Sequence, residues 1–149
     1  KDNGGVIQMC ILSDYVKKPR ENEARDDSLA ALKKKYGPWA EIKDKAIRDK
    51  YSAEYYAVKD KYPEDMATVK DFVDHIDHVV NLIGINHVGI GTDFDGGGGL
   101  RDCQDVSQLP NITAELLRRG YSKNDLEKIW GRNFMRIFKE VIKLTKEKV

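Results

Sequence analysis

The chain has 149 residues, a length that suits one domain, and its 26 Lys and Arg residues nearly balance its 25 Asp and Glu residues. Because this balance gives no overall basic field, the sequence predicts no nucleic-acid partner and no anionic membrane surface. No apolar run approaches the roughly 20 residues of a membrane-spanning helix, and no signal peptide opens the chain. The first residue is Lys1 rather than methionine, which is typical of a piece of a longer protein.

The first predicted element is a buried β-strand. Residues 5–12 form a nearly continuous apolar run, which is typical of a strand covered on both faces. The charged residues 13–27, interrupted by Pro19, are expected to form a long surface loop. Cys10 lies in the strand and Cys103 in a later loop, and since they form no Cys-x-x-Cys pair both are expected to be free thiols.

Two charged helices are predicted next. They cover residues 28–36 and 39–62, and the stop signal Gly37-Pro38 separates them. One face of the second helix carries a stripe of tyrosines at helical spacing. No basic groove accompanies this stripe, so the sequence favours packing over base stacking for its members, Tyr51, Tyr55 and Tyr56.

The clearest amphipathic pattern covers residues 68–82, and it predicts a helix that ends near Gly84. A second apolar run, residues 86–91, predicts another strand. A strand, a connection with a helix, and a second strand make a right-handed βαβ unit, in which the two strands are parallel.

The remaining part of the chain is predicted to be helical. Residues 110–120 fit a helix closed by a glycine, and Ser122 with Asp125 forms a capping box for the last helical segment. Gly131 and Asn133 are expected to bend or split that segment.

The order of these elements, β, α, β, α, predicts a helix-rich α/β fold with a parallel sheet. Two parallel strands that are apolar on both faces cannot form a covered sheet by themselves. The sequence therefore indicates the end of a larger α/β domain. Its open strand edges predict that the chain associates with itself.

A loop rich in glycine and aspartate follows the second strand. Residues 89–99 read Gly-Ile-Gly-Thr-Asp-Phe-Asp-Gly-Gly-Gly-Gly, which places Asp93 and Asp95 where a buried strand emerges. In parallel α/β folds this rim holds catalytic and ligand-binding side chains. The loop lacks the Gly-Lys-Ser/Thr of a Walker motif, has Phe94 where a dinucleotide fingerprint needs a small residue, and has Gln104 where a calcium loop needs glutamate.

Two roles stay open for Asp93. Its carboxylate can transfer a proton, anchor a metal-bound water or hold a substrate amine. Alternatively, it caps the backbone amides of its own loop, a role that fits Asp95 better.

Three histidines are further candidates. His75 and His78 are three residues apart on a predicted helix, but no third metal ligand accompanies them, so a packed or surface pair is expected. His87, just before the second strand, is expected to form a hydrogen bond at the end of the strand opposite Asp93.

Several stretches together resemble one family. They are Asp-His-Ile-Asp-His at 74–78, His-Val-Gly-Ile-Gly-Thr-Asp-Phe-Asp-Gly at 87–96, Asp-Val-Ser at 105–107, Leu-Pro at 109–110 and Glu-Leu-Leu-Arg-Arg-Gly at 115–120. This set is similar to the C-terminal part of the membrane (renal-type) dipeptidases, which are zinc peptidases on an amidohydrolase-like (β/α)₈ barrel. The resemblance is weakest over residues 17–62, which look like the longer loop of bacterial members.

The resemblance implies a fold. Residues 5–12 would be strand 7 and residues 88–91 strand 8 of a (β/α)₈ TIM-type barrel. Residues 1–149 would then form a single C-terminal fragment of the barrel domain.

The resemblance also implies site residues. Asp93 matches the family's active-site aspartate after strand 8, which is assigned a role in proton transfer or substrate binding. Tyr15 matches a tyrosine after strand 7 that lines the substrate pocket. Cys10 and Ile11 stand where members often carry Asn-Phe, a departure beside that pocket.

The family's zinc ligands, by contrast, find no match in this chain. They are an early His-x-Asp pair, a bridging glutamate and two later histidines, all from earlier strands. The resemblance thus implies a parent that uses two zinc ions to hydrolyse dipeptides, while this chain holds no metal and is inactive alone. The alternative is a stand-alone α/β binding or interaction module without catalysis.

Overall fold

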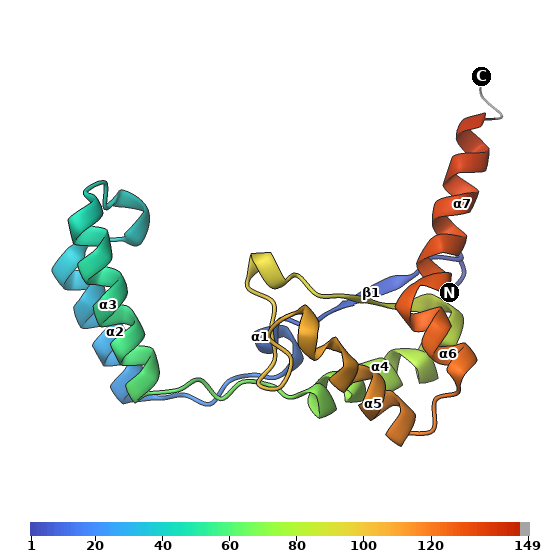
Figure 1. Ribbon diagram of the computed structural model, residues 1–149, viewed down its shortest axis with the longest axis horizontal. Coiled ribbons are helices and arrows are strands. Elements are labelled where there is room, and N and C mark those ends of the chain that lie inside the picture. The colour runs from blue at the N-terminus through green and yellow to red at the C-terminus, as the bar shows by residue number, and fades with distance from the viewer. Residues whose placement is uncertain (147–149) are drawn as a thin grey trace. The chain divides into compact units, whose positions relative to one another are not determined.

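The computed structural model describes residues 1–146, which divide into two compact units. The main unit combines Lys1–Lys18 with the chain from Met66 onward, and the hairpin unit is Pro19–Asp65. Figure 1 shows the elements of both units in chain order. Within the described residues, no helix is long and apolar enough to cross a membrane.

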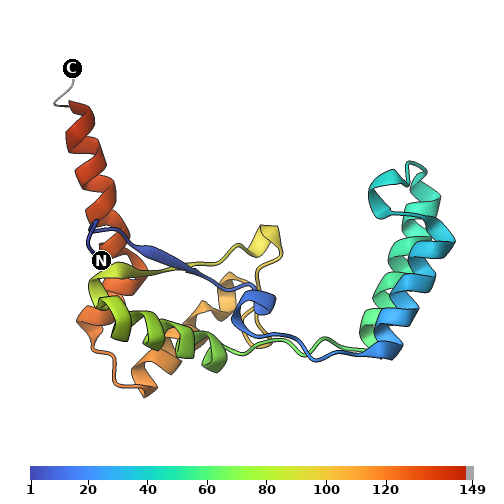
Figure 2. The same cartoon turned by 180° about the vertical axis from the view of Figure 1, so that it is seen from behind.

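The main unit is built on a two-stranded parallel sheet. Strand β1 (Ile7–Cys10), the blue arrow in Figure 2, pairs with β2 (Val88–Gly91). In the register of the pair, Ile7 lies opposite Val88. The predicted α/β class and parallel pairing are thus confirmed. The expectation that the first strand is covered on both faces is wrong for its first half, where Ile7 and Gln8 are exposed.

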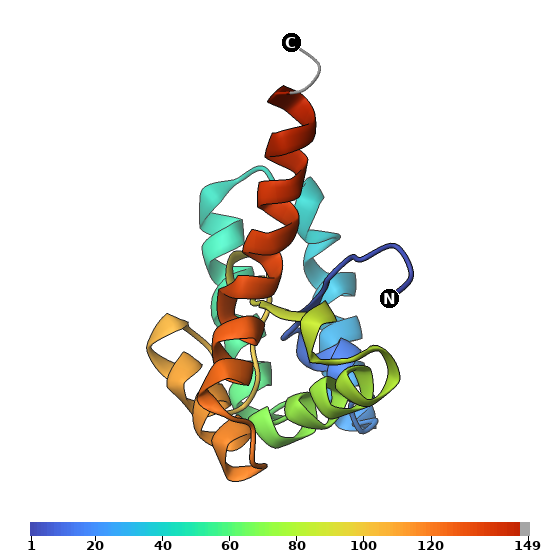
Figure 3. The same cartoon turned by 90° about the vertical axis from the view of Figure 1, so that its right-hand side faces the viewer.

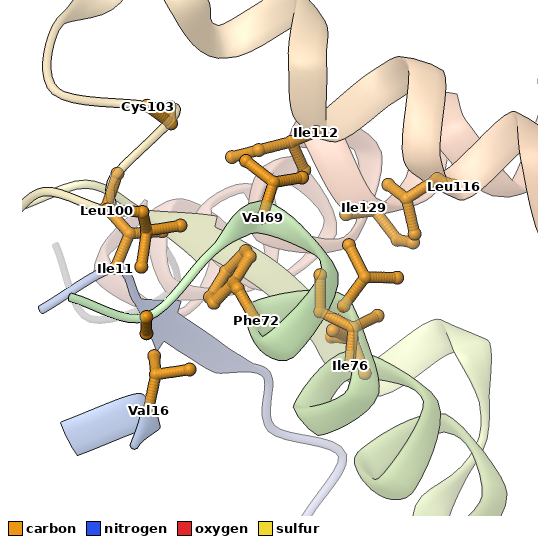
Figure 4. Close-up of a cluster of buried hydrophobic side chains, with 13 residues drawn as sticks. Ile11, Val16, Val69, Phe72, Ile76, Leu100, Cys103, Ile112, Leu116 and Ile129 are labelled. Atoms are coloured by element: carbon orange, nitrogen blue, oxygen red, sulfur yellow. The ribbon is translucent and has the colours of Figure 1, made fainter. Parts of the chain in front are cut away.

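Helix α4 (Val69–Ile83) forms the centre of the core. It begins in a capping box between Thr68 and Asp71, and Gly84 closes it with φ 96°. One apolar stripe of α4 is buried, as the spacing predicts. Figure 4 shows this stripe meeting side chains from both post-strand loops, from α5 and from the segment after α6; the labelled side chains are Ile11, Val16, Val69, Phe72, Ile76, Leu100, Cys103, Ile112, Leu116 and Ile129.

Among the described residues, three α-helices and a π-helical turn follow the second strand and its loop: α5 (Leu109–Arg118), α6 (Lys123–Glu127), the turn Lys128–Arg132 and α7 (Asn133–Lys146). They run in orange and red in Figure 3. The predicted capping box at the start of α6 is confirmed.

The predicted interruption before α7 is also present, as the π-helical turn. It contains Gly131, and buried Asn133 follows it. The Asn133 side-chain amide donates to the carbonyls of Ile85 (2.7 Å) and Val88 (2.8 Å), which ties α7 to the start of β2. Ile85 begins a short 3₁₀ turn, Ile85–His87.

The segment after β1 differs from the predicted long loop. A one-turn helix, α1 (Ser13–Val16), follows the strand, and helix α2 (Glu23–Tyr36) begins well before residue 28. The side chain of Asn22 accepts a hydrogen bond from the Arg25 amide at 3.1 Å and so caps α2. Because the segment is rich in charged residues, the sequence indicated a loop and the cap at Asn22 was not recognised.

The second helix of the hairpin unit is shorter than predicted. It is α3 (Lys45–Lys61), capped by Asp44, whereas Trp39–Glu41 form a 3₁₀ turn. The predicted tyrosine stripe does pack: the ring of Tyr51 lies 5.3 Å from Trp39 and 6.1 Å from Tyr55, measured between centroids.

Candidate functional site

The two residues that the sequence singles out lie beyond the carboxyl ends of the two strands. Tyr15 belongs to α1, just after β1, and Asp93 comes just after β2. The amide of Gly99, at the end of the Asp93 loop, donates to the carbonyl of Ile11 at 2.8 Å. Both segments therefore lie at the same end of the sheet, beyond the carboxyl ends of its strands, as Figure 1 shows for α1 and the yellow loop.

The backbone of Asp93 is left-handed, with φ 52° and ψ 32°. Among the described residues it is the only one other than glycine with positive φ. Such residues are uncommon and gather at functional sites, although aspartate tolerates this region better than most. The loop is tight, since a Cβ at Gly96 would collide with the Asp93 carboxylate and one at Gly98 with the Thr92 carbonyl. Glycine at these two positions permits this path of the chain.

The Asp93 carboxylate is exposed and does not cap the 3₁₀ turn Phe94–Gly96 that follows it. Its backbone organises the loop instead, because the Asp93 carbonyl accepts from the amides of Gly96 (3.0 Å) and Gly98 (2.6 Å). The carboxylate is thus free to accept or donate a proton or to meet a cationic group. Asp95, also exposed, lies within the turn.

Tyr15 is 75% exposed, so its ring and hydroxyl can meet a ligand. Its helix is fastened at the base, where Val16 is buried and the hydroxyl of Ser13 accepts a hydrogen bond from the Ala67 amide at 2.8 Å. In the described part of the chain, no hydrogen bond joins the side chains of Tyr15 and Asp93.

The histidines belong to α4 and to the 3₁₀ turn before β2. His75 and His78 are exposed on α4, and the described residues contain no group of three or more His, Cys, Asp or Glu that could hold a metal ion. His87 Nδ1 lies 2.7 Å from the Gly5 carbonyl, which confirms the hydrogen bond predicted at the opposite end of the strand. Cys10 and Cys103 are free thiols, as predicted.

A partly buried ionic network that joins α4 to the end of α5 is a feature that sequence reasoning missed. Arg119 Nη1 lies 2.6 Å from carboxylate oxygens of both Asp74 and Asp77, and its Nε lies 2.8 Å from Glu115 Oε1. The Tyr121 hydroxyl donates to Asp77 at 2.6 Å. These aspartates stand in the run that resembles the family, but their partner lies more than forty positions on, so no local spacing could reveal it.

This network shifts the acidity of its members. The hydrogen bond from Arg118, with those from Arg119, lowers the pKa of Glu115 to about 2 despite opposing desolvation. Burial, with the hydrogen bond to Asp77, raises the pKa of Tyr121. Because both groups keep one charge state over the ordinary pH range, the network acts as a structural clamp between α4 and α5 rather than as acid–base machinery.

Comparison with known proteins identifies relatives over nearly the whole chain. Residues 1–148 match the family described as Membrane dipeptidase (Peptidase family M19). "Dipeptidase aclJ" of Aspergillus oryzae is 37% identical over 130 residues, which cover 87% of this chain and 28% of that protein. "Dipeptidase tcpJ" of Claviceps purpurea is 48% identical over 82 residues, which cover 54% of this chain and 19% of that protein.

A solved structure shares the fold. The crystal structure of the probable dipeptidase PvdM from Pseudomonas aeruginosa superposes with a TM-score of 0.63 and 35% identity, and the match covers 91% of this chain and 36% of that one. This chain thus spans only about a third or less of the length of these relatives. Since the family match extends over residues 1–148, the chain belongs to the membrane dipeptidase family.

Proposed function

We propose that the chain is the C-terminal part of a zinc-dependent dipeptidase that hydrolyses the peptide bond of dipeptides, with Asp93 in its active site. The family and the names of its relatives support the reaction class. The observation that carries the site is the exposed, uncapped carboxylate of Asp93 on a tight loop at the carboxyl end of β2. Polar groups in this position serve catalysis or binding across parallel α/β folds.

In this proposal β1 and β2 are strands 7 and 8 of a (β/α)₈ TIM-type barrel, and residues 1–149 are a single C-terminal fragment of that domain. Parallel pairing with α4 in the connection is the arrangement of a barrel unit. The match to only 36% of the Pseudomonas chain is consistent with further strands in the parent.

Asp93 and Tyr15 receive distinct roles. The Asp93 carboxylate transfers a proton or binds the charged amine of the dipeptide, because it is exposed and accepts no capping hydrogen bond. Tyr15, exposed at the same end of the sheet, lines the substrate pocket through its ring and hydroxyl.

Zinc ligands are assigned to other parts of the parent. The family resemblance implies two zinc ions, yet the described residues of this chain contain no group of three or more ligating side chains, so they do not fit a zinc site of their own. We therefore propose that the 149-residue chain binds no zinc at stoichiometric level and does not hydrolyse dipeptides alone.

The test uses the full-length parent and the 149-residue chain side by side, each supplied with zinc and assayed on a panel of dipeptides. The parent is expected to turn over dipeptides and the chain to show none. Turnover by the chain alone would contradict the assignment of the ligands. An inactive parent that holds zinc would favour the alternative of a binding or interaction module.

We also propose that the isolated chain associates with itself through strand edges or exchanged helices. Among the described residues β1 and β2 pair only with each other, and each leaves one edge open. Light scattering is expected to show a species larger than a monomer. A monomer at all concentrations tested would refute this proposal.

A further inference from the structure

One buried residue connects the two segments that carry Tyr15 and Asp93. The amide of Ala67 donates to the hydroxyl of Ser13 at 2.8 Å, and the carbonyl of Ala67 accepts from the amide of Arg101 at 2.9 Å. Ala67 has no exposed surface. It therefore joins α1 to the turn that ends the Asp93 loop.

The Arg101 side of this junction is held firmly. The Asp102 carboxylate accepts from the Val69 amide at 2.8 Å, and the Leu100 amide donates to the Cys103 carbonyl at 2.9 Å. Leu100 and Cys103 are themselves fully buried. Backbone groups and buried side chains thus fix Ala67 relative to the end of the Asp93 loop.

On the α1 side, the bond from the Gly99 amide to the Ile11 carbonyl anchors the chain just before the helix, and the Ser13 hydroxyl and buried Val16 hold the helix itself. Helix α1 has only four residues, and Leu12 at its N-cap provides no side-chain cap. One helical turn is not stable on its own, so α1 keeps its place through these tertiary contacts. Loss of the Ser13 hydroxyl would leave the buried Ala67 amide without its partner, which a protein avoids by rearranging locally.

We propose that Ser13 is a positioning residue for substrate binding, whose hydroxyl holds α1, and with it Tyr15, in register with the Asp93 loop. This inference rests on the proposed function. Ser13 itself touches no substrate; it acts through Tyr15, which lies two residues further along the same turn.

The test is made in the zinc-loaded full-length parent. Removal of the hydroxyl in Ser13→Ala is expected to raise KM for dipeptides about three- to tenfold, the size of one hydrogen bond, with a smaller change in kcat. Ser13→Thr keeps the hydroxyl and is expected to restore KM. Ser28→Ala is the matched control, because it removes a hydroxyl that bonds only the Ala24 carbonyl within α2, and it should leave KM unchanged.

A double-mutant cycle with Tyr15→Ala separates positioning from general destabilisation. If Ser13 acts through Tyr15, Ser13→Ala adds nothing to the KM of the Tyr15→Ala enzyme. Additive effects on KM would overturn the proposal, and so would a Ser13→Thr variant as impaired as Ser13→Ala.

Hydrogen exchange supplies a readout independent of activity. In Ser13→Ala the amides of Ala67 and of Lys17 at the end of α1 are expected to exchange faster, whereas Ser13→Thr retains their protection. Unchanged exchange would overturn the proposal. An inactive wild-type parent would overturn the proposed function and this role together, while an active parent with unaltered KM in Ser13→Ala would overturn this role alone.

Discussion

The main unit and the hairpin unit contain helices of similar length, 15 residues in α4 and 17 in α3, but hold them in different ways. Helix α4 buries an apolar stripe in a shared cluster of 13 side chains (Figure 4). Within residues 19–65, all of which the structure describes, only Leu32 and Ile42 are buried hydrophobic side chains. The hairpin relies on caps, ring contacts and exposed ion pairs such as Lys35–Glu54.

The main unit is therefore expected to provide most of the stability of the chain, and it also carries the proposed site. Long-range burial fixes the main unit, which carries Tyr15 and Asp93, to a defined geometry. Local interactions each contribute little, so the hairpin is expected to open more readily than the main unit.

Truncation of the core helix is expected to have the largest effect on stability. Phe72 is fully buried, so Phe72→Ala should lower the free energy of unfolding by about 3–5 kcal/mol. The aromatic control in the hairpin is Tyr56→Ala; this residue is 63% exposed, and a loss of about 1 kcal/mol or less is expected. Urea denaturation followed by circular dichroism measures both. Equal losses would refute the contrast between the units.

Disruption of the ionic network around Arg119 is expected to have the second-largest effect on stability. Arg119→Ala removes a guanidinium whose side chain is 13% exposed and which bonds three carboxylates, so a loss of about 2 kcal/mol is expected. Arg132→Ala is the matched control, because that side chain is 63% exposed and pairs with Glu127 outside the network, and it should cost less than about 1 kcal/mol. The same denaturation assay applies. An unchanged free energy of unfolding in Arg119→Ala would show that the network does not stabilise the contact between α4 and α5.

A smaller loss of stability is expected when the pH is lowered and Glu115 takes up a proton. Glu115 has a pKa of about 2 in the folded chain against an ordinary value of 4.5, so the unfolded chain takes up the proton first. Its contribution to stability is therefore complete above pH about 4.5 and is lost as the pH falls towards 2. Glu115→Gln should flatten the loss of stability with acid in this window, whereas Glu140→Gln, at the exposed pair with Lys143, should hardly change it. Identical acid curves for wild type and Glu115→Gln would contradict the assignment.

Removal of the hairpin should have the smallest effect on the main unit. Replacing Pro19–Asp65 by a short Gly/Ser linker removes no member of the 13-residue cluster. The melting temperature of the main unit is expected to change by only a few degrees. Unfolding of the shortened chain would show that the hairpin supports the core after all.

Local signals made much of the main unit predictable. The Ser122–Asp125 capping box and the glycine after α4 are patterns of residues close together in the sequence, so both could be predicted. Continuous apolar runs indicated both strands. The boundaries of the hairpin helices were harder to predict from the sequence. Asn22 caps α2 inside a charged stretch that carries no apolar periodicity, so the segment had the composition of a loop.

Long-range features of the site could not be predicted. The partnership of Arg119 with Asp74 and the hydrogen bond between Ser13 and Ala67 join residues 45 and 54 positions apart. Periodicity and spacing carry no signal over such distances. The position of Asp93 at a strand end was predictable, but its left-handed backbone and uncapped carboxylate emerge only from the folded loop.

The most direct test of the account is the substitution Asp93→Asn in the zinc-loaded full-length parent, with Asp95→Asn as the matched control two residues away. Asn keeps the size of the side chain and tolerates the left-handed backbone, so the fold should persist while proton transfer is lost. The account predicts that kcat/KM for dipeptides falls by about a hundredfold or more in Asp93→Asn and changes little in Asp95→Asn. Full activity in a folded Asp93→Asn enzyme would contradict it.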